Sequence, residues 1–272
     1  MTQHFGVVGH PVSHSLSPTM FGAAFWEYNL DADYELFDVE PAQLSEFLKR
    51  VPSEPIAGLS VTIPHKETIV PLLNAVDEKA KIIGAVNTVV NKDGKLKGYN
   101  TDWQGALKAL EEVTDLSGKT VVVLGAGGAA AAIMYACRQA GATVIVLNRT
   151  EEKAKELADR FGCGYGLLDE ILQHPADVLV HTTSVGMTPH TDVSLVPRAY
   201  FKRGMIVMDI VYNPLETKLV KEARAVGCKI IPGHKMLLYQ AEKQFELWFK
   251  KKPPVEKMEK AVVAALQLRI KN

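Results

Sequence analysis

Cysteine is scarce in this chain, with three residues among 272, and no two of them form a Cys-x-x-Cys pair. Cys137, Cys163 and Cys228 therefore provide neither a disulfide framework nor the spacing of a zinc ribbon, and such scarcity is typical of the reducing cytosol. An excess of one charge is also lacking, because 31 Lys and Arg balance 31 Asp and Glu. Proteins that bind nucleic acid or anionic membranes usually carry a basic excess, so we expect neither partner.

Long apolar runs are missing too. The longest segment without a charged residue, 120–137, contains three glycines and a block of alanines, so it is better explained as strand, turn and helix than as a membrane span. The first residues show no basic segment followed by an apolar stretch, as a signal peptide would. We therefore expect a cytoplasmic protein of one large domain or two ordinary ones.

Short apolar runs alternate with helical patterns along the chain, and no internal repeat is present. Before residue 102 we expect strands at 5–8, 34–39 and 58–63, helices at 18–28 and 44–50, and a hairpin of 85–91 and 95–99 around Asp93-Gly94. Beyond it we expect strands at 121–124, 143–147, 177–181, 205–210 and 229–231, helices ending at 139, 161 and 226, and two final helices at 236–250 and 255–270.

Strands that alternate with helices indicate right-handed βαβ crossovers and a parallel sheet. The prediction is an α/β protein of two domains. Residues 1–102 form an N-terminal α/β domain, residues 103–235 form a Rossmann-like doubly wound parallel sheet, and the helices of 236–272 return to the first domain.

A glycine-rich segment, Gly125-Ala126-Gly127-Gly128-Ala129-Ala130, follows a predicted strand and opens a predicted helix. The first glycine permits the tight turn, the second lets the backbone approach a pyrophosphate, and Ala130 is small enough for close packing of helix on sheet. The pyrophosphate would bind the free N–H groups at the start of the helix. A tight helix–sheet contact without any ligand would use the same residues.

The second strand of this region ends at Asn148-Arg149-Thr150. NAD-binding folds carry an acidic residue there, which bonds the ribose 2′-hydroxyl. Arg149 can instead pair with a 2′-phosphate, to which the hydroxyl of Thr150 can donate. The segment therefore favours NADP, although a solvated arginine beside a helix-capping Thr150 is the simpler alternative.

Several polar residues stand out before residue 103. Ser15 and Ser17 can face the same side of an extended segment and bind a carboxylate, or Ser17 can simply cap a helix. Lys66 follows a strand and a proline turn, a position suited to a cleft, although most lysines lie on the surface. Asp102 can cap the helix that follows it.

Histidine does not indicate a metal here. His10 and His14 are four residues apart, but Pro11 lies between them, and no acidic ligand joins them or His65. We therefore expect no metal site.

Taken together, these segments resemble one family, the shikimate dehydrogenases, over the whole length of the chain. The motifs that carry the resemblance are, in order, Ser15-Leu16-Ser17-Pro18, Val61-Thr62-Ile63-Pro64-His65-Lys66, Gly84-Ala85-Val86-Asn87-Thr88, Asn100-Thr101-Asp102, Gly125-Ala126-Gly127-Gly128-Ala129, Asn148-Arg149-Thr150, and Met236-Leu237 with Gln240. One feature departs from the family: His234 and Lys235 are bulky residues in a turn where the family often has small ones.

The resemblance implies an NADP-dependent oxidoreductase that reversibly reduces 3-dehydroshikimate to shikimate in aromatic amino-acid biosynthesis, as a monomer or homodimer. It implies that residues 1–102 bind substrate and that Lys66 and Asp102 form a proton-transfer pair. The implied substrate-binding residues are Ser15, Ser17, Thr62, Asn87, Tyr212 and Gln240. The implied cofactor-binding residues are Glu78, Gly125, Ala126, Gly127, Gly128, Ala129, Asn148, Arg149, Thr150, Lys153, Ile210 and Gly233.

Three other functions share these features. One is a quinate or dual quinate/shikimate dehydrogenase that uses NAD, another is a non-catalytic NADP(H)-binding regulator, and a third is some other small-molecule reductase on the same dinucleotide fold. The presence of both Lys66 and Asp102 argues against the regulator, since a sensor needs no proton-transfer pair. The third alternative leaves the motifs of the first domain unexplained.

Overall fold

The computed structural model describes residues 2–271 and divides into two compact units. Unit 1 comprises the chain up to Thr101 together with Gln240–Arg269, and unit 2 comprises Asp102–Tyr239. The second division falls inside helix α9 (Gly233–Phe249) rather than before it. The dinucleotide-type sheet is therefore inserted into the sequence of the other unit.

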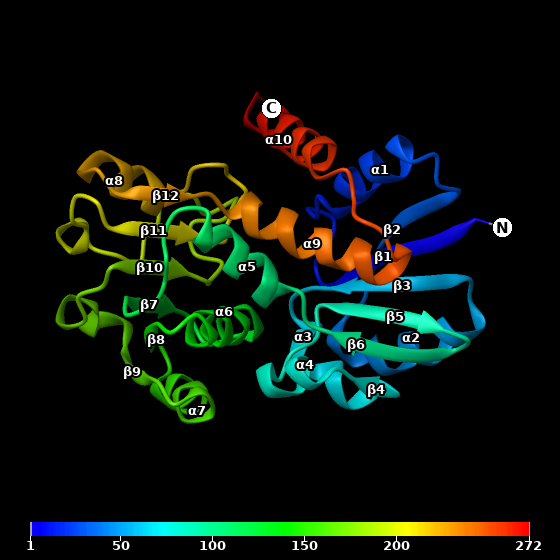
Figure 1. Ribbon diagram of the computed structural model, residues 1–272, viewed down its shortest axis with the longest axis horizontal. Helices are drawn as coiled ribbons and strands as arrows, with labels where there is room; N and C mark the ends of the chain where they lie inside the picture. Colours follow the sequence, from blue (N-terminus) through cyan, green and yellow to red (C-terminus); the bar gives the residue numbers. More distant parts are fainter. Residues whose placement is uncertain (1, 272) are drawn as a thin grey trace. The chain divides into compact units, whose positions relative to one another are not determined.

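Unit 1 contains a mixed six-stranded sheet in the order β2-β1-β3-β5-β6-β4 (Figure 1). The strands are β1 (Gln3–Gly9), β2 (Ala32–Asp38), β3 (Ile56–Val61), β4 (Ala75–Val76), β5 (Thr88–Lys92) and β6 (Lys95–Tyr99). β5 is antiparallel to both of its neighbours, and the other pairs are parallel. Asp93 and Gly94 join β5 to β6 with φ of 53° and 76°, the left-handed pair that the Asp-Gly hairpin predicts.

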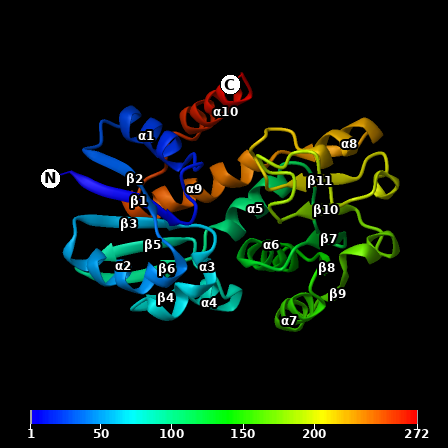
Figure 2. The same cartoon turned by 180° about the vertical axis from the view of Figure 1, so that it is seen from behind.

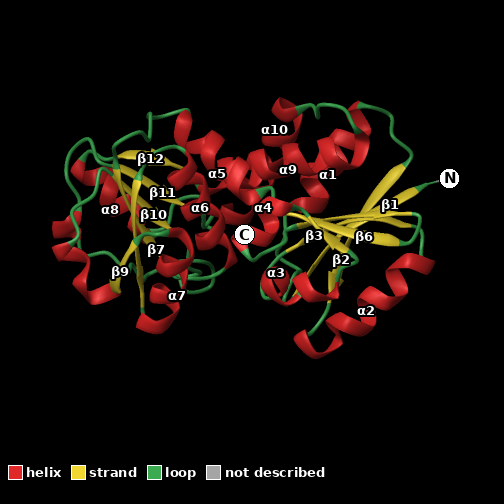
Figure 3. Ribbon diagram, turned by 60° about the horizontal axis from the view of Figure 1, so that its bottom comes forward, coloured by secondary structure: helices red, strands yellow, loops and turns green. Residues whose placement is uncertain are grey.

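Helices cover both faces of this sheet. They are α1 (Ser17–Glu27), α2 (Leu44–Arg50), α3 (His65–Thr68), α4 (Glu78–Ile83), the second half of α9, and α10 (Val255–Lys271). Figure 3 shows α1 and α9 on one face and α2 on the other. On the first face the ring centroid of Trp248 lies 4.9 Å from that of Phe5 and 5.1 Å from that of Phe21. A Cβ on Gly58 would overlap Trp248, so the last helices complete the core begun by the first strand.

Unit 2 is a parallel six-stranded sheet in the order β12-β11-β10-β7-β8-β9, which Figure 2 shows from behind. Its strands are β7 (Thr120–Leu124), β8 (Thr143–Asn148), β9 (Gly164–Leu167), β10 (Val178–His181), β11 (Ile206–Asp209) and β12 (Lys229–Ile231). When the strands are numbered within the unit in chain order, this is the 3-2-1-4-5-6 order of dinucleotide folds, taken from the opposite edge. Residues 121–124 are buried, as expected of a central parallel strand.

The helices of unit 2 are α5 (Asp102–Glu111), α6 (Gly128–Gln139), α7 (Glu151–Phe161), α8 (Lys218–Val226) and the first turns of α9. Leu219 and Val220 of α8 pack in one cluster with Val122 and Leu124 of β7. The α/β class and the doubly wound parallel sheet expected from the sequence are confirmed. No helix among residues 2–271 combines the length and apolar character needed to cross a bilayer.

Candidate functional site

Asn87 is the hub of the candidate substrate residues in unit 1, and its side chain is buried just before β5. Its amide nitrogen donates to Thr101 Oγ1 at 2.9 Å and to Gln240 Oε1 at 3.1 Å. Its Oδ1 accepts the backbone N–H of Thr101 at 2.7 Å. The structure therefore brings together two predicted substrate residues, Asn87 and Gln240, that are 153 positions apart in the chain.

Gln244, which the sequence analysis did not identify, is hydrogen-bonded to the backbone of Asn87. Its amide nitrogen donates to the Asn87 carbonyl and to Thr88 Oγ1, both at 2.9 Å. Its Oε1 accepts from Ser60 Oγ at 2.8 Å, and Ser60 in turn accepts from the Tyr34 hydroxyl at 2.6 Å. The signal that could have found Gln244 is its place one helical turn beyond Gln240, on the same face of α9.

The same chain of hydrogen bonds reaches Ser17. The pKa of Tyr34 lies above its ordinary value, chiefly because burial disfavours the phenolate, while the hydroxyls of Ser60 and Ser17 act in the opposite direction. We call this set the neutral network, since none of its side chains carries a charge at neutral pH; its members are Ser17, Tyr34, Ser60, Asn87, Thr88, Thr101, Gln240 and Gln244.

Ser17 does not cap helix α1. The helix begins at Ser17 itself, and Leu16 occupies the cap position without any side-chain bond. Ser15 Oγ accepts the Ser17 N–H at 3.2 Å, a local bond from a serine side chain to the backbone two residues later. Ser15 is half-buried whereas Ser17 is only 6% exposed, so Ser15 is the more accessible hydroxyl for a carboxylate.

Lys66 lies in the short helix α3, directly after the turn that ends β3. Its backbone carbonyl accepts the Val86 N–H at 2.7 Å, and the buried ring of His65 is bonded through Nε2 to the Val39 carbonyl at 2.6 Å. Two contacts thus fix the backbone here, and the Lys66 side chain is half-buried rather than on the open surface. Thr62, also half-buried, is held by its N–H to the Val8 carbonyl at 3.0 Å.

Asp102 is the first residue of α5 and of unit 2, and it is 3% exposed. A buried carboxylate is unusual unless it is paired, so this position is atypical of a residue that merely caps a helix. Glu78 opens α4 in unit 1 and is exposed. Its predicted role at the cofactor and the pairing of Lys66 with Asp102 both stay predictions.

The glycine-rich turn of unit 2 connects β7 to α6. Gly125 has a φ of 108°, and a Cβ there would lie 2.7 Å from Thr182 Oγ1 and 2.9 Å from Thr183 Cγ2. Gly127, by contrast, has open space where a Cβ would stand, and it precedes the helix without any side-chain cap. The first glycine is required by the fold and the second leaves room for a ligand, so a pyrophosphate fits against the N–H groups of Gly128 and Ala129. Ala126 lies between the two glycines.

The tip of β8 is basic. Arg149, Thr150 and Lys153 are exposed, and Asn148 Nδ2 donates to the Thr150 carbonyl at 2.9 Å. Thr150 occupies the cap position of α7, as the simpler alternative expects, but its hydroxyl makes no capping bond. The cationic side chains and this hydroxyl suit a 2′-phosphate, although acidic residues follow in the first turn of α7.

The segment after β11 carries Ile210 and Tyr212, both half-buried. The Ile210 N–H donates to the His181 carbonyl at 3.1 Å. A Cβ on Gly233 would lie 2.6 Å from both the Asp209 and the Val211 carbonyl oxygens, so only glycine allows α9 to start this close. The bulky residues after it are accommodated: Lys235 Nζ lies 5.7 Å from the centroid of the Tyr239 ring.

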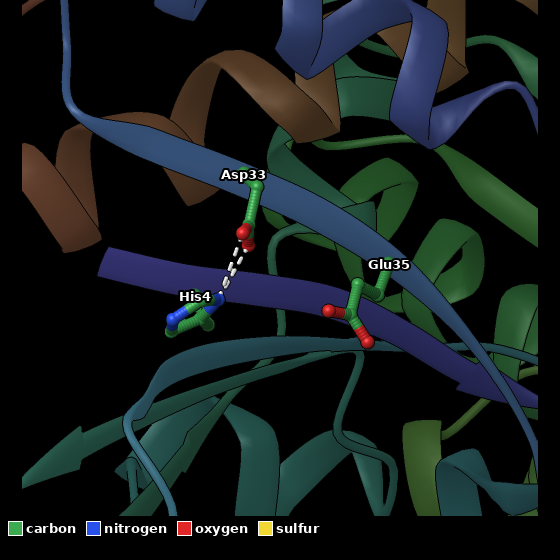
Figure 4. A group of neighbouring side chains, drawn as sticks. All are labelled: His4, Asp33 and Glu35. Atoms are coloured by element: carbon green, nitrogen blue, oxygen red, sulfur yellow. Dashed lines mark hydrogen bonds and ion pairs between the residues drawn. The ribbon is translucent and has the colours of Figure 1, made fainter. Parts of the chain in front are cut away.

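Two histidines of unit 1, His4 and His10, each bond a different aspartate. His10 Nδ1 lies 2.6 Å from Asp38 Oδ1. Figure 4 shows another group, in which His4 of β1 bonds Asp33 of β2 at 2.8 Å beside Glu35. His4 and Asp33 are directly opposed in the register of the two strands, so an ordinary cross-strand hydrogen bond accounts for their approach.

Comparison with known proteins gives consistent matches along the chain. The shikimate dehydrogenase substrate binding domain matches residues 7–89, the shikimate/quinate 5-dehydrogenase family matches 107–221, and the shikimate 5′-dehydrogenase C-terminal domain matches 233–263. A Pyrococcus abyssi protein named shikimate dehydrogenase (NADP(+)) is 47% identical over 264 residues, which cover 96% of this chain and 98% of that protein.

A second relative and a solved structure agree with these matches. The Geobacillus kaustophilus protein of the same name is 44% identical over 98% of this chain and 100% of its own length. The crystal structure of shikimate 5-dehydrogenase from Thermus thermophilus in complex with NADP(H) and shikimate superposes with a TM-score of 0.91. It is 39% identical and covers 97% of this chain and 100% of that one.

Proposed function

We propose that this chain, which belongs to the shikimate dehydrogenase family, catalyses the reversible, NADPH-dependent reduction of 3-dehydroshikimate to shikimate in aromatic amino-acid biosynthesis. The observation that carries the proposal is the full-length similarity to a shikimate 5-dehydrogenase whose crystals hold both NADP(H) and shikimate. The scarcity of cysteine favours the cytoplasm as its compartment.

The residues present fit NADP. The cradle from Gly125 to Ala129 offers backbone N–H groups and open space for the pyrophosphate, and the tip of β8 offers the cationic Arg149 for the 2′-phosphate. Ile210 and Gly233 would border the nicotinamide. When bound, the cofactor supplies the hydride. No other step of the reaction needs it, so the remaining chemistry belongs to this chain's own side chains.

Most of the proposed substrate-binding residues belong to unit 1, and Tyr212 belongs to unit 2. The hydroxyls of Ser15 and Ser17 would hold the carboxylate, and Thr62, Asn87, Tyr212 and Gln240 would bond the other oxygens. Because Gln240 Oε1 already accepts from Asn87, the amide nitrogen of Gln240 is the group that donates to a substrate hydroxyl. The neutral network thereby sets the direction of that bond before substrate arrives.

Proton transfer falls to Lys66 and Asp102. As the substrate ketone gains hydride, its oxygen becomes an alkoxide and needs a proton donor within hydrogen-bond reach. The Lys66 ammonium donates that proton from Nζ and stabilises the developing charge. The Asp102 carboxylate accepts a hydrogen bond from the ammonium and orients it. In the oxidation direction the same two groups remove the proton from the shikimate hydroxyl.

The test is an absorbance assay at the reduced-nicotinamide band that crosses NADP and NAD with shikimate and quinate. We expect turnover of shikimate with NADP, at a kcat/KM well above every other combination. If quinate with NAD is the best pair, the chain is a quinate dehydrogenase. Binding of NADPH without turnover of any substrate would refute the enzymatic proposal.

A further inference from the structure

A buried pair that the proposed reaction does not use stands at the carboxyl ends of two central strands of unit 2. His181 ends β10 and Asp209 ends β11, and they are 1% and 0% exposed. His181 Nδ1 lies 2.9 Å from Asp209 Oδ1. Burying an ionisable pair is costly unless its geometry is good and its other polar atoms are bonded, so what else these two residues bond is informative.

The Asp209 carboxylate accepts from three directions. Besides His181, its Oδ1 accepts the Val211 N–H at 3.0 Å, and its Oδ2 accepts the Thr217 hydroxyl at 2.6 Å. Thr217 Oγ1 also accepts the Val220 N–H at 3.2 Å, as the side-chain cap of α8. The carboxylate therefore ties the backbone that follows β11 to the start of the next helix.

The second ring nitrogen of His181 bonds the segment that follows β10. Its Nε2 lies 2.6 Å from Thr183 Oγ1, and that oxygen accepts the Val185 N–H at 3.2 Å. The tautomer that fits all of these partners carries its proton on Nδ1 and accepts the Thr183 hydroxyl at Nε2. One continuous relay thus runs from Thr183 through the pair to Thr217.

The relay joins the segment after β10 to the segment after β11, and each of these lies against a glycine proposed to bind the cofactor. Thr182 and Thr183 stand against Gly125, and Thr182 Oγ1 donates to the Leu124 carbonyl at 2.6 Å. On the other side, the carbonyls of Asp209 and Val211 stand against Gly233. In open α/β sheets the ligand binds outside the carboxyl ends of the strands, which is where this relay lies.

We infer that His181 and Asp209 are positioning residues for the nicotinamide end of the cofactor. They act through Thr183 on the loop beside Gly125, and through Val211 on the segment that carries Ile210 and Tyr212. This inference rests on the proposed function, because that function places Ile210 and Gly233 beside the nicotinamide. Neither residue touches a reacting atom, so the relay affects how the reactants are aligned.

The test uses the full chain with three relay variants: Thr183→Val, His181→Asn and Asp209→Asn. Thr183→Val is nearly isosteric and removes only the hydroxyl. The matched control is Tyr200→Phe, which removes a hydroxyl of the same unit that donates to the His174 carbonyl at 2.8 Å and takes part in none of the relay's hydrogen bonds. For each protein one measures Tm, the NADPH dissociation constant by fluorescence, and kcat with both KM values.

We expect Thr183→Val and His181→Asn to lower kcat/KM for NADPH by about tenfold or more, because misplacement by about 1 Å can cost up to about a hundredfold. The KM for 3-dehydroshikimate should change less than kcat/KM for NADPH, because Tyr212 is the one proposed substrate-binding residue on the segments that the relay joins. Tyr200→Phe should lower Tm at least as much as Thr183→Val and leave all kinetic constants within about twofold. Asp209→Asn faces three donors with an amide, so it should show the largest loss of all if it folds.

The inference is overturned if Thr183→Val and His181→Asn lose Tm as the control does but keep kcat and the NADPH constants of the wild type. A wild-type protein that binds NADPH but reduces no 3-dehydroshikimate would sink the proposed function instead. In that case the NADPH dissociation constants of the same variants still decide the inference, because the cofactor binds without turnover.

Discussion

The two units of this protein bury polar side chains in different ways. Unit 1 gathers hydroxyls and amides into the neutral network around Asn87, with the amide of Gln244 bonded on both its oxygen and its nitrogen. Unit 2 buries an ionisable pair, His181 and Asp209, and leaves the cradle above it free of side chains at Gly125 and Gly127. Under the proposed function, unit 1 presents side chains to the substrate, and unit 2 presents backbone N–H groups to the pyrophosphate.

The difference follows from what each unit is proposed to bind. A small polyhydroxylated acid must be recognised oxygen by oxygen, and neutral amides supply both donors and acceptors without the cost of burying charge. A pyrophosphate requires many N–H groups at close range, and any side chain there would intrude. We therefore expect substrate binding by unit 1 to be sensitive to the removal of side-chain groups. We expect cofactor binding by unit 2 to be sensitive to atoms added at the glycines of the cradle.

The largest effect is expected from removing the charge of Lys66. Lys66→Ala should lower kcat by about 10²–10⁴-fold with little change in Tm, because its main interaction develops in the transition state. Asp102→Asn should cost a comparable factor. Steady-state kinetics with shikimate and NADP measure the loss, and Lys81→Ala, an exposed lysine of α4, serves as control. A near-normal kcat in Lys66→Ala would remove Lys66 from the mechanism.

The next effect tests the guanidinium of Arg149, the charge on which the preference for NADP is proposed chiefly to depend. Arg149→Ala should reduce the preference for NADP over NAD by about ten- to a hundredfold, since one charge-assisted contact is worth about 1.5–3 kcal/mol. The ratio of kcat/KM for the two cofactors reports it, and added salt should erode the wild-type preference. Lys155→Ala, an exposed charge further along α7, should leave the ratio within about twofold. A preference that survives the loss of Arg149 would show that the 2′-phosphate is read elsewhere.

Removing an amide from the neutral network should cost both stability and substrate binding. Gln244→Leu removes three buried hydrogen bonds and leaves the Ser60 hydroxyl without its acceptor, whereas the Asn87 carbonyl and Thr88 Oγ1 keep other partners. A lost hydrogen bond costs about 0.5–1.5 kcal/mol, and an unpaired buried group costs about 1–3 kcal/mol. We expect the free energy of unfolding to fall by about 2–5 kcal/mol and KM for shikimate to rise several-fold. Denaturant titration and kinetics measure these. Gln267→Leu, an exposed glutamine of α10, is the control, and equal behaviour of the two variants would contradict the network's role.

Adding one methyl group at Gly125 or at Gly127 separates the requirements of the fold from those of the ligand. Gly125→Ala combines a φ of 108° with contacts to Thr182 and Thr183, so it should lower stability by about 1–3 kcal/mol. Gly127→Ala has a φ of −102° and open space, so Tm should stay nearly constant while NADPH binds several-fold more weakly. Thermal melts with and without NADPH test both. Unchanged NADPH affinity in Gly127→Ala would mean that the phosphates do not pass over it.

The smallest effect appears only at high pH. Burial raises the pKa of Tyr200 from 10.0 to about 12. Because the folded state holds this proton more tightly than the unfolded chain, the associated stability is complete below about pH 10 and is lost as pH rises toward about 12. Tyr200→Phe should therefore flatten the decline of unfolding free energy between those values, whereas Tyr165→Phe, at a 39%-exposed site, should not. Identical slopes in wild type and Tyr200→Phe would contradict the shift.

Much of the fold could be predicted because its signals are local. The Asp93-Gly94 turn, helix α7 and strand β12 lie where the sequence predicts them, since turn residues, caps and apolar runs act within a few positions. Strand β9 was missed because Gly164-Tyr165-Gly166-Leu167 has neither an apolar run nor clear alternation, and it pairs only at the sheet edge. The short elements α3, α4 and β4 were missed for the same lack of periodicity.

The candidate site was predicted less completely. The resemblance to shikimate dehydrogenases, now confirmed by relatives along the whole chain, supplied the candidate substrate residues. It did not supply Gln244, Ser60 or Tyr34, because a partner 156 positions away leaves no pattern in either local sequence. The alternative that Ser17 caps a helix was wrong because α1 begins at Ser17 itself, one residue earlier than the sequence predicts, and Leu16 occupies the cap position.

The division of the chain has a consequence for biosynthesis. Phe5 emerges from the ribosome before unit 2, yet two of the rings that cover it, Trp248 and Phe249, emerge after unit 2. All six strands of unit 2 lie between them in the sequence, so the sheet of unit 2 can close as soon as β12 has been made. The first strands of unit 1 therefore keep part of their apolar surface uncovered while unit 2 folds. During that interval the first strands are the segment of this protein most in need of a chaperone.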